Sequence, residues 1–135
     1  MKLIADTNIL VRAAMADDPA QSPMAQRLLV DADLIAIPTV ALCELAWVLA
    51  RIYKRSRSEI ATVIRSFIEA ENARVEGVTI AAGLALLDAG GDFADGVIAH
   101  EGRALGGQTF ASFDRSAVKR LAERGIVTLD PSDRR

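Results

Sequence analysis

Cysteine and histidine are almost absent from this sequence, and their scarcity excludes several kinds of site. Cys43 is the one cysteine and His100 the one histidine among 135 residues. A single cysteine cannot form an internal disulfide, and we expect Cys43, which lies in an apolar segment, to pack as a small buried residue. No Ser-His-Asp set is visible, because nothing pairs His100 with a nucleophile. We expect His100 to be a surface or packing residue.

Long apolar runs, an N-terminal leader pattern and a strong charge of one sign are also missing. No apolar run approaches the ~18 residues of a membrane span, and Asp6 interrupts the segment where a signal peptide would need its apolar core. The net charge of −2 gives no general attraction to nucleic acid. We therefore expect a cytoplasmic protein without a membrane contact, which meets any polyanion through a local patch or through metal ions.

Half of the residues are hydrophobic and a quarter are charged, which is typical of an ordinary globular chain. The length predicts a single domain over residues 1–135, with a polar, frayed tail from about Asp130. Short apolar runs alternate with helical patterns, so we predict an α/β fold, a three-layer α/β/α domain with a central parallel sheet. The expected strands are Leu3–Ala5, Leu34–Ile37, Ala73–Val78, Gln108–Phe113 and Ile126–Leu129. The expected helices are Asn8–Met15, Ala25–Val30, Thr39–Lys54, a helix capped by Ser56 and Glu59 that runs to Ile68, Ala81–Leu87, Phe93–Leu105 and Ser116–Arg124.

Two acids directly follow predicted strands. Asp6 ends the first apolar run and is followed by Thr7 and Asn8, while Asp114 ends the fourth strand after Ser112 and Phe113. In an open α/β sheet the reactive crevice lies beyond the carboxyl ends of the strands. Either acid could instead serve only as the N-cap of the helix that follows it.

Three further acids lie in or beside helical patterns. Glu44 is the one charge within the apolar part of Thr39–Lys54, where a buried carboxylate is costly unless it is paired or bound to a cation. Asp92 and Asp95 are three residues apart, near one face of a first helical turn. The alternatives are that Glu44 meets solvent at a helix rim and that an acid in the first turn only complements the helix dipole. We interpret Glu44 and Asp95 as lying in first turns of inward-facing helices.

If Asp6, Glu44, Asp95 and Asp114 converge in one crevice, they cannot all stay ionised without a cation. Carboxylate oxygens without nearby cysteine or histidine select Mg²⁺ or Mn²⁺ over zinc. The glycine pairs of the sequence lack the lysine that a P-loop requires. A carboxylate-held metal site is suited to hydrolysis of a phosphodiester.

The segment Arg51–Arg57 carries the densest positive charge, with Arg51, Lys54, Arg55 and Arg57 within seven residues. Basic runs are often solvated surface, and this one also favours the C-terminus of the preceding helix. It is nonetheless the best local candidate for contacts with RNA phosphates.

The acidic blocks, taken in order, resemble those of the PIN-domain ribonucleases. The blocks are Asp6-Thr7-Asn8 after a strand, Glu44 in an apolar helix, Asp92-Phe93-Ala94-Asp95, and Ser112-Phe113-Asp114. The resemblance runs from Lys2 to about Leu129 and is strongest to the VapC-type toxins of type II toxin–antitoxin pairs. It implies an α/β/α fold and Mg²⁺- or Mn²⁺-dependent endonucleolytic cleavage of RNA.

The resemblance also implies roles for individual residues. Asp6 and Asp95 would coordinate metal, while Glu44 and Asp114 would complete the acidic pocket. Asp92 matches an additional acid, and polar positions that orient ligands and water are matched by Thr7, Asn8 and Ser112.

Members of this family usually pair with a small VapB-like antitoxin and commonly form homodimers. The apolar helices Thr39–Lys54 and Ala81–Leu87 could serve either contact, or could only fill the core of this chain. A second hypothesis is a catalytically silent PIN-like module that binds RNA or protein. A phosphatase of the haloacid-dehalogenase type is disfavoured, because the position two residues after Asp6 is Asn8 rather than a second aspartate.

Overall fold

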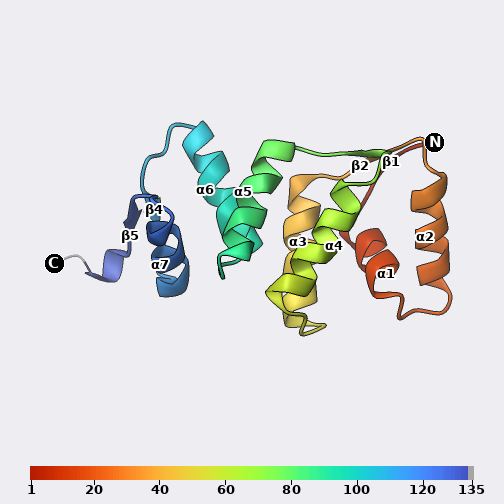
Figure 1. Cartoon of the computed structure of the whole chain (residues 1–135), viewed down its shortest axis with the longest axis horizontal. Coiled ribbons are helices and arrows are strands. Elements are labelled where there is room, and N and C mark those ends of the chain that lie inside the picture. Colours follow the sequence, from red (N-terminus) through yellow and green to blue (C-terminus); the bar gives the residue numbers. More distant parts are fainter. Residues whose placement is uncertain (134–135) are drawn as a thin grey trace. The chain divides into compact units, whose positions relative to one another are not determined.

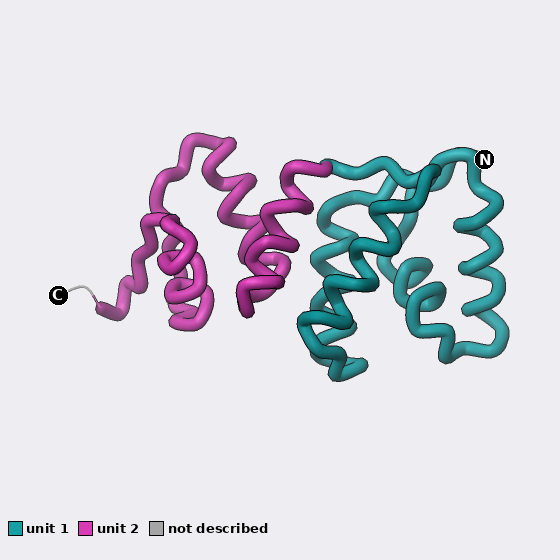
Figure 2. Tube along the Cα trace, in the orientation of Figure 1, with its two compact units in different colours: residues 1–76 teal, residues 77–135 magenta. Residues whose placement is uncertain are grey.

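The computed structural model describes residues 1–133, in which short strands alternate with helices (Figure 1). By internal contacts the chain divides into two compact units, Met1–Glu76 and a second unit that begins at Gly77 (Figure 2). The division falls between a strand and the helix that follows it.

The first unit contains a parallel sheet of three strands with the order β1-β2-β3. Its strands are β1 (Lys2–Ile4), β2 (Leu34–Ala36) and β3 (Ala73–Arg74). Two pairs of helices connect them: α1 (Thr7–Met15) with α2 (Gln21–Asp31), and α3 (Thr39–Arg51) with α4 (Arg57–Ile68). Parallel pairing places the carboxyl ends of all three strands at one edge of this sheet.

Helix packing in the first unit follows the apolar periodicity of the sequence. Helix α3 contacts both α1 and α4, and its buried side chains include the fully enclosed Leu42, Leu45 and Leu49. Helix α4 begins with the predicted capping box, in which Ser56 accepts from the backbone N–H of Glu59 and the Glu59 side chain accepts from that of Ser56. The predicted start of α4 is therefore confirmed.

The second unit contains α5 (Gly77–Asp88), α6 (Phe93–Ala104) and α7 (Arg115–Glu123). Two short parallel strands, β4 (Phe110–Ala111) and β5 (Thr128–Leu129), pair with Phe110 opposite Thr128. A single 3₁₀ turn, η1 (Pro131–Asp133), follows β5. All strand pairs among residues 1–133 are parallel, as predicted.

Several element boundaries differ from expectation. The strand expected over Ala73–Val78 stops at Arg74, because Gly77 and Val78 already form the first turn of α5. Helix α2 begins at Gln21, four residues before the first apolar residue of its pattern. The expected strand Gln108–Phe113 is reduced to Phe110–Ala111, the part that pairs with β5.

The frayed tail predicted from Asp130 is wrong for residues 130–133. Asp130 is buried, with 5% of its surface exposed, and the next three residues form η1. The chain end at Arg134 and Arg135 lies outside the described residues. Within the described part of the chain, no helix combines the length and the apolar character needed to cross a membrane.

Helices α5 and α6 cross closely because glycines lie at their contact. A Cβ atom on Gly96 would lie 2.6 Å from the carbonyl oxygen of Ala82 and 2.9 Å from the Cα of Gly83. A Cβ atom on Gly83 would lie 2.6 Å from the ring of Phe93, which is almost fully enclosed. The two helices therefore meet at backbone distance.

We expect Gly96→Ala to destabilise the protein by about 1–3 kcal/mol, because the added methyl group must push the α5 backbone away. Gly102→Ala is the matched control in the same helix, since no atom lies within 4 Å of its Cβ position. The control should leave the free energy of unfolding unchanged or raise it by up to about 1 kcal/mol through helix propensity. Urea unfolding of both variants measures the difference, and equal effects would contradict the close crossing.

Candidate functional site

Asp6 lies beyond the carboxyl end of β1, at the start of α1. It occupies the N-cap position with extended backbone (φ −75°, ψ 156°), yet its side chain makes no capping hydrogen bond. The alternative that its carboxylate serves only to cap α1 is therefore wrong. Asp6 and Asn8 are both exposed at this end of the sheet.

Thr7 joins the N-terminus of α1 to the middle of α3. Its hydroxyl group donates a hydrogen bond of 2.9 Å to Oε2 of Glu44, although the two residues are 37 positions apart. This bond holds one oxygen of Glu44 next to the residue that follows Asp6. The first unit thus brings the first two acidic blocks of the sequence together.

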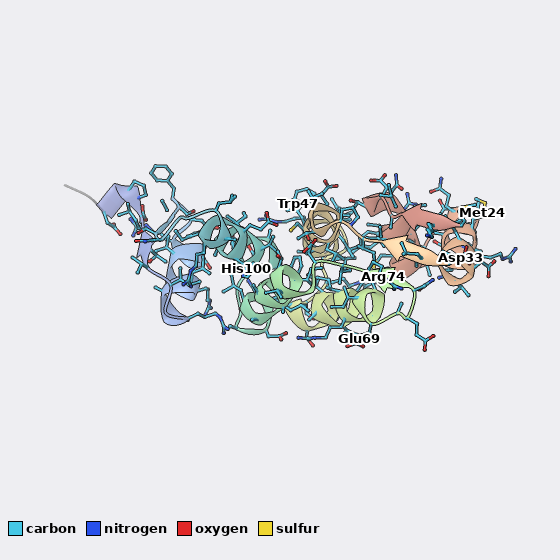
Figure 3. All side chains as sticks on the ribbon, turned by 90° about the horizontal axis from the view of Figure 1, so that it is seen from above. Met24, Asp33, Trp47, Glu69, Arg74 and His100 are labelled. Atoms are coloured by element: carbon cyan, nitrogen blue, oxygen red, sulfur yellow. The ribbon has the colours of Figure 1, made fainter. Side chains whose placement is uncertain are left out.

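The environment of Glu44 differs from the one predicted. Glu44 lies in the second turn of α3 and is exposed, on the same helix face as Val40 and Trp47. Those two apolar side chains are 64% and 58% exposed, and Figure 3 labels Trp47 among the side chains of this unit. The prediction of a buried carboxylate in an inward-facing first turn is wrong, because the buried side chains of α3, which include Leu42, Leu45 and Leu49, lie on its other side.

Asp95 of the second unit is influenced by burial and by two neighbouring acids, Asp92 and Asp114. Asp95 lies half-buried in the first turn of α6, and Asp92 is the N-cap residue of that helix. Burial raises the pKa of Asp95 above its ordinary value, and the negative charges of Asp92 and Asp114 raise it further. These three carboxylates therefore share a region in which a positive charge would be favourable.

Asp114 caps α7, as the alternative interpretation of this residue predicted. Its Oδ1 atom accepts hydrogen bonds from the backbone N–H groups of Ser116 (3.0 Å) and Ala117 (3.1 Å). The Ser112 hydroxyl oxygen accepts from the backbone N–H of Asp114 at 3.0 Å, which fixes the turn between β4 and α7. Both capping bonds use the same oxygen, and Oδ2 has no hydrogen bond with any residue from 1 to 133. Capping and metal coordination are thus compatible at this carboxylate.

The donor chemistry of these residues fits a hard divalent cation. The candidate ligands are all carboxylate oxygens, and a cation would relieve the repulsion that raises the pKa of Asp95. Among residues 1–133, no three acidic, histidine or cysteine side chains lie close enough together to hold a metal ion by themselves. Asp6 and Glu44 belong to the first unit, and Asp92, Asp95 and Asp114 to the second.

The basic segment lies at the turn between α3 and α4, and its four cationic residues are exposed. Arg51 ends α3, Lys54 adopts a left-handed φ of 56°, and Arg57 begins α4. Nη1 of Arg55 lies 3.8 Å from Oε2 of Glu59 in an exposed ion pair.

A tyrosine anchors this turn. The Tyr53 hydroxyl donates a 2.8 Å hydrogen bond to Oδ2 of Asp17, in the loop after α1. This bond raises the pKa of Tyr53, because it stabilises the protonated phenol beside a negative charge. The turn that carries the cations on either side of Tyr53 is therefore linked by this hydrogen bond to the loop after α1.

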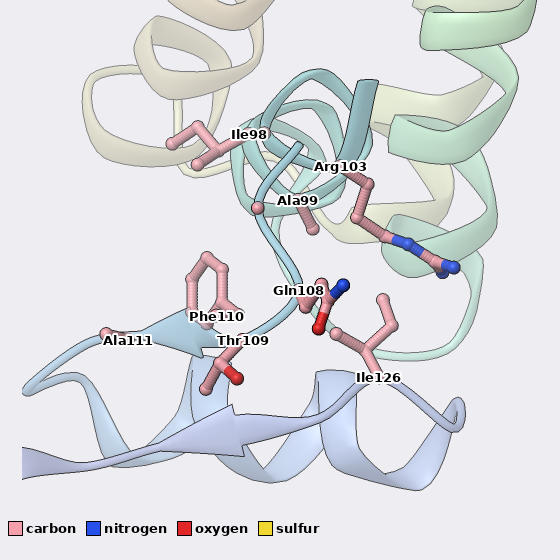
Figure 4. Close-up of a pocket in the computed structure, with 10 residues that line it drawn as sticks. Ile98, Ala99, Arg103, Gln108, Thr109, Phe110, Ala111 and Ile126 are labelled. Carbon is pink, nitrogen blue, oxygen red and sulfur yellow. The ribbon is translucent and has the colours of Figure 1, made fainter. Parts of the chain in front are cut away.

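The second unit also contains a small cavity of about 210 Å³ between α6 and the approach to β4. Its lining is mainly apolar, with Ile98, Phe110 and Ile126 beside the polar Gln108 and Arg103 (Figure 4). The lining includes residues before and within β4, whereas Asp114 follows this strand. It holds none of the candidate acids.

Sequence reasoning missed Asp130 and Arg115. Asp130 is one of two buried polar residues in the described chain, the other being Ser22. A signal was present, because Asp130 directly follows an apolar strand just as Asp6 does. The polar residues after Asp130 led to its assignment to a frayed tail.

Comparisons with known proteins identify one family. Residues 3–124 match the family model described as the PIN domain, so the match includes residues of both units. No curated protein matches. Among solved structures, the chain is similar to Mycobacterium tuberculosis VapC20, described as a sarcin-ricin loop cleaving toxin, with 19% identity and a TM-score of 0.46 over 96% of this chain and 100% of that chain. The family match confirms the α/β fold with parallel strands that the sequence predicts.

We expect Asp95→Asn to stabilise the metal-free protein at neutral pH. Because the folded-state pKa of Asp95 is raised, the folded chain binds this proton more tightly than the unfolded chain, and stability falls as pH rises through that pKa. The asparagine removes the penalty, so its benefit should disappear below the ordinary pKa of aspartate, about 3.9. Thermal unfolding in EDTA at both pH values measures this, with exposed Asp31→Asn as the control. Destabilisation by Asp95→Asn at neutral pH would contradict the assignment.

Proposed function

The chain belongs to the PIN domain family, and on this premise we propose that it is a metal-dependent endoribonuclease that hydrolyses RNA phosphodiester bonds. Membership of this family supports a nuclease. The observation that carries the finer proposal is the half-buried position of Asp95 beside the carboxylates of Asp92 and Asp114, where a cation would be favourable.

In this proposal residues 1–135 act as a single PIN-like domain, and Asp6, Glu44, Asp95 and Asp114 act as one ligand set. Asp6 and Asp95 hold Mg²⁺ or Mn²⁺, while Glu44 and Asp114 complete the acidic pocket. When bound, such an ion polarises the phosphodiester and lowers the pKa of the attacking water. The donor set supports this choice of ion, because it contains only carboxylate oxygens.

The neighbouring polar groups orient the acids. Thr7 donates to Glu44 and so restricts its carboxylate to one direction. Asp114 is restricted by the two N–H groups of α7 that bind its Oδ1 atom, and its Oδ2 atom would be available to a cation. Ser112 fixes the turn that precedes α7, and Asp92 adds a further negative charge beside Asp95. Asn8 is exposed beside Thr7, where it can orient water.

Arg51, Lys54, Arg55 and Arg57 then provide contacts with the RNA backbone. Their exposure at one turn supports this role, as does the Tyr53–Asp17 hydrogen bond that anchors the turn. Such contacts attract RNA locally although the net charge of the chain is −2.

We further propose that the protein is the toxin of a VapBC-type toxin–antitoxin pair in the cytoplasm. The order of the acidic blocks supports this, because it resembles that of the VapC-type toxins. A small VapB-like antitoxin and a second copy of the chain are its proposed protein partners. The exposed apolar side chains of Val40 and Trp47 on α3 support a protein contact near Glu44.

A catalytically silent PIN-like module that binds RNA or protein is the alternative. The raised pKa of Asp95 favours the enzyme, since a module that only binds RNA gains nothing from repelling carboxylates.

Cleavage of a mixed RNA pool by the purified, antitoxin-free protein tests the proposal. We expect cutting with Mg²⁺ or Mn²⁺ and none with EDTA. The cleavage rate should fall by more than about 100-fold in Asp6→Asn and in Asp95→Asn, because removing a metal ligand should cost more than removing a residue that only orients a ligand. Exposed Asp31→Asn is the control and should cut at the wild-type rate.

Thermal unfolding with and without Mn²⁺ completes the experiment. The wild type should be stabilised by the ion, and both variants should be folded but less stabilised. Wild-type cutting by either folded variant would overturn the site assignment. A folded wild type that neither cuts RNA nor binds metal would favour the silent module.

A further inference from the structure

Asp130 is a buried carboxylate at the carboxyl end of β5. Only 3% of its side chain is exposed. Its Oδ1 atom accepts hydrogen bonds from the backbone N–H of Ser132 (2.9 Å) and from the Ser132 hydroxyl group (2.5 Å). Its Oδ2 atom is buried without a hydrogen bond from any described residue. A buried carboxylate in this state requires a compensating positive charge.

Arg115 supplies that charge. Its Nε atom lies 3.7 Å from the buried Oδ2 of Asp130, and its Nη2 atom lies 3.6 Å from Oδ1 of Asp133. Two carboxylates therefore lie within ion-pair distance of the guanidinium group. The hydrogen bonds from Ser132 and the charge of Arg115 keep the pKa of Asp130 below its ordinary value, so the ion pair persists at neutral pH.

Charge compensation alone does not explain the position of Arg115. A guanidinium group that served only to neutralise Asp130 would be expected to lie buried with it, yet 76% of the Arg115 side chain is exposed. A planar guanidinium group has five N–H donors, and the two carboxylate contacts leave most of them directed to solvent. The Arg115 side chain is therefore paired with two carboxylates and still exposed to solvent.

Arg115 is also placed next to the proposed acidic site. It follows Asp114 directly and is the first residue of α7. Strands β4 and β5 are parallel, so Asp114 and Asp130 both lie beyond the same edge of this strand pair. Lys119, four residues after Arg115, is exposed on the same face of α7. These two cations form a stripe that starts beside Asp114.

We propose that Arg115 binds a phosphate group of the RNA strand beside the acidic site, and that Asp130 acts as a positioning residue which, with Asp133, holds its guanidinium group ready. This inference rests on the proposed function and adds an RNA contact outside the basic turn of α3 and α4. The guanidinium fork matches the geometry of a phosphate group, and prior anchoring reduces the side-chain entropy lost on binding.

The charges around Arg115 allow a positioning role of Asp130 to be distinguished from an effect of net charge alone. The acids near this end of the unit are Asp92, Asp95, Asp114, Asp130 and Asp133, so removal of any one by substitution to asparagine should strengthen RNA binding if only net charge matters. A positioning role predicts the opposite for Asp130→Asn, because the anchor of Arg115 is lost while its charge remains.

The test measures binding of a fluorescein-labelled, mixed-sequence single-stranded RNA in Mg²⁺ over a salt series. All variants carry Asp95→Asn, which prevents cleavage. Arg115→Gln should bind RNA roughly three- to tenfold more weakly. It should also reduce the slope of log K against log salt by about 0.7, the loss of one phosphate contact with a single strand. Arg124→Gln removes the same charge from the other end of α7 and should change both quantities less.

Asp130→Asn should weaken RNA binding with an unchanged salt slope, and thermal unfolding confirms that the variant is folded. If it does not fold, Arg115→Lys replaces it, since the exposed site accepts a lysine that keeps the charge but cannot span the carboxylates and a phosphate. Arg115→Lys should leave the slope of log K against log salt unchanged and should bind the RNA more weakly.

Equal affinity and slope in Arg115→Gln and its parent would overturn the RNA contact while leaving the proposed function intact. Unchanged or tighter binding by folded Asp130→Asn, or full affinity in Arg115→Lys, would overturn the positioning role. If the parent binds no RNA at any salt concentration, both the proposed function and this inference fail.

Discussion

Burial of Asp95 beside two other carboxylates is the constraint on which the candidate acidic site of the second unit depends. Asp95 is half-buried and feels the charges of Asp92 and Asp114, an arrangement that costs free energy in the absence of a cation. Asp92 begins the same helix as Asp95, and Asp114 is fixed by the N-terminus of α7. The fold therefore keeps these three carboxylates near one another.

Contacts of neighbouring residues fix the positions of Asp95 and Glu44. Gly96, the residue after Asp95, lies at the close crossing of α5 and α6, so the turn that carries Asp95 is set by backbone contact between helices. In the first unit, Thr7 restricts Glu44 through a single hydrogen bond. Asp95 and Glu44 are thus positioned by helices whose buried contacts come from other residues.

Two carboxylates show how one residue type performs different tasks. Asp114 uses one oxygen to cap α7 and leaves the other free of hydrogen bonds within residues 1–133, so structural and chemical roles coexist. Asp130 uses one oxygen for Ser132 and directs the other to Arg115. The acid near the surface can meet a cation from solution, whereas the buried acid takes its cation from the chain.

The sequence by itself determined the alternation of strands and helices, the capping box of α4 and the order of the acidic blocks that indicates the family. These features depend on periodicity, capping chemistry and spacing along the chain, which are local. Only the tertiary structure decided that Glu44 is exposed and bonded to Thr7, that Asp130 is buried, and that Gly83 and Gly96 face one another. The physical reason is that periodicity shows which residues share a face, whereas burial depends on which distant segment covers that face. The same limit explains Asp130, whose polar neighbours predicted a frayed tail although it is buried and is followed by η1.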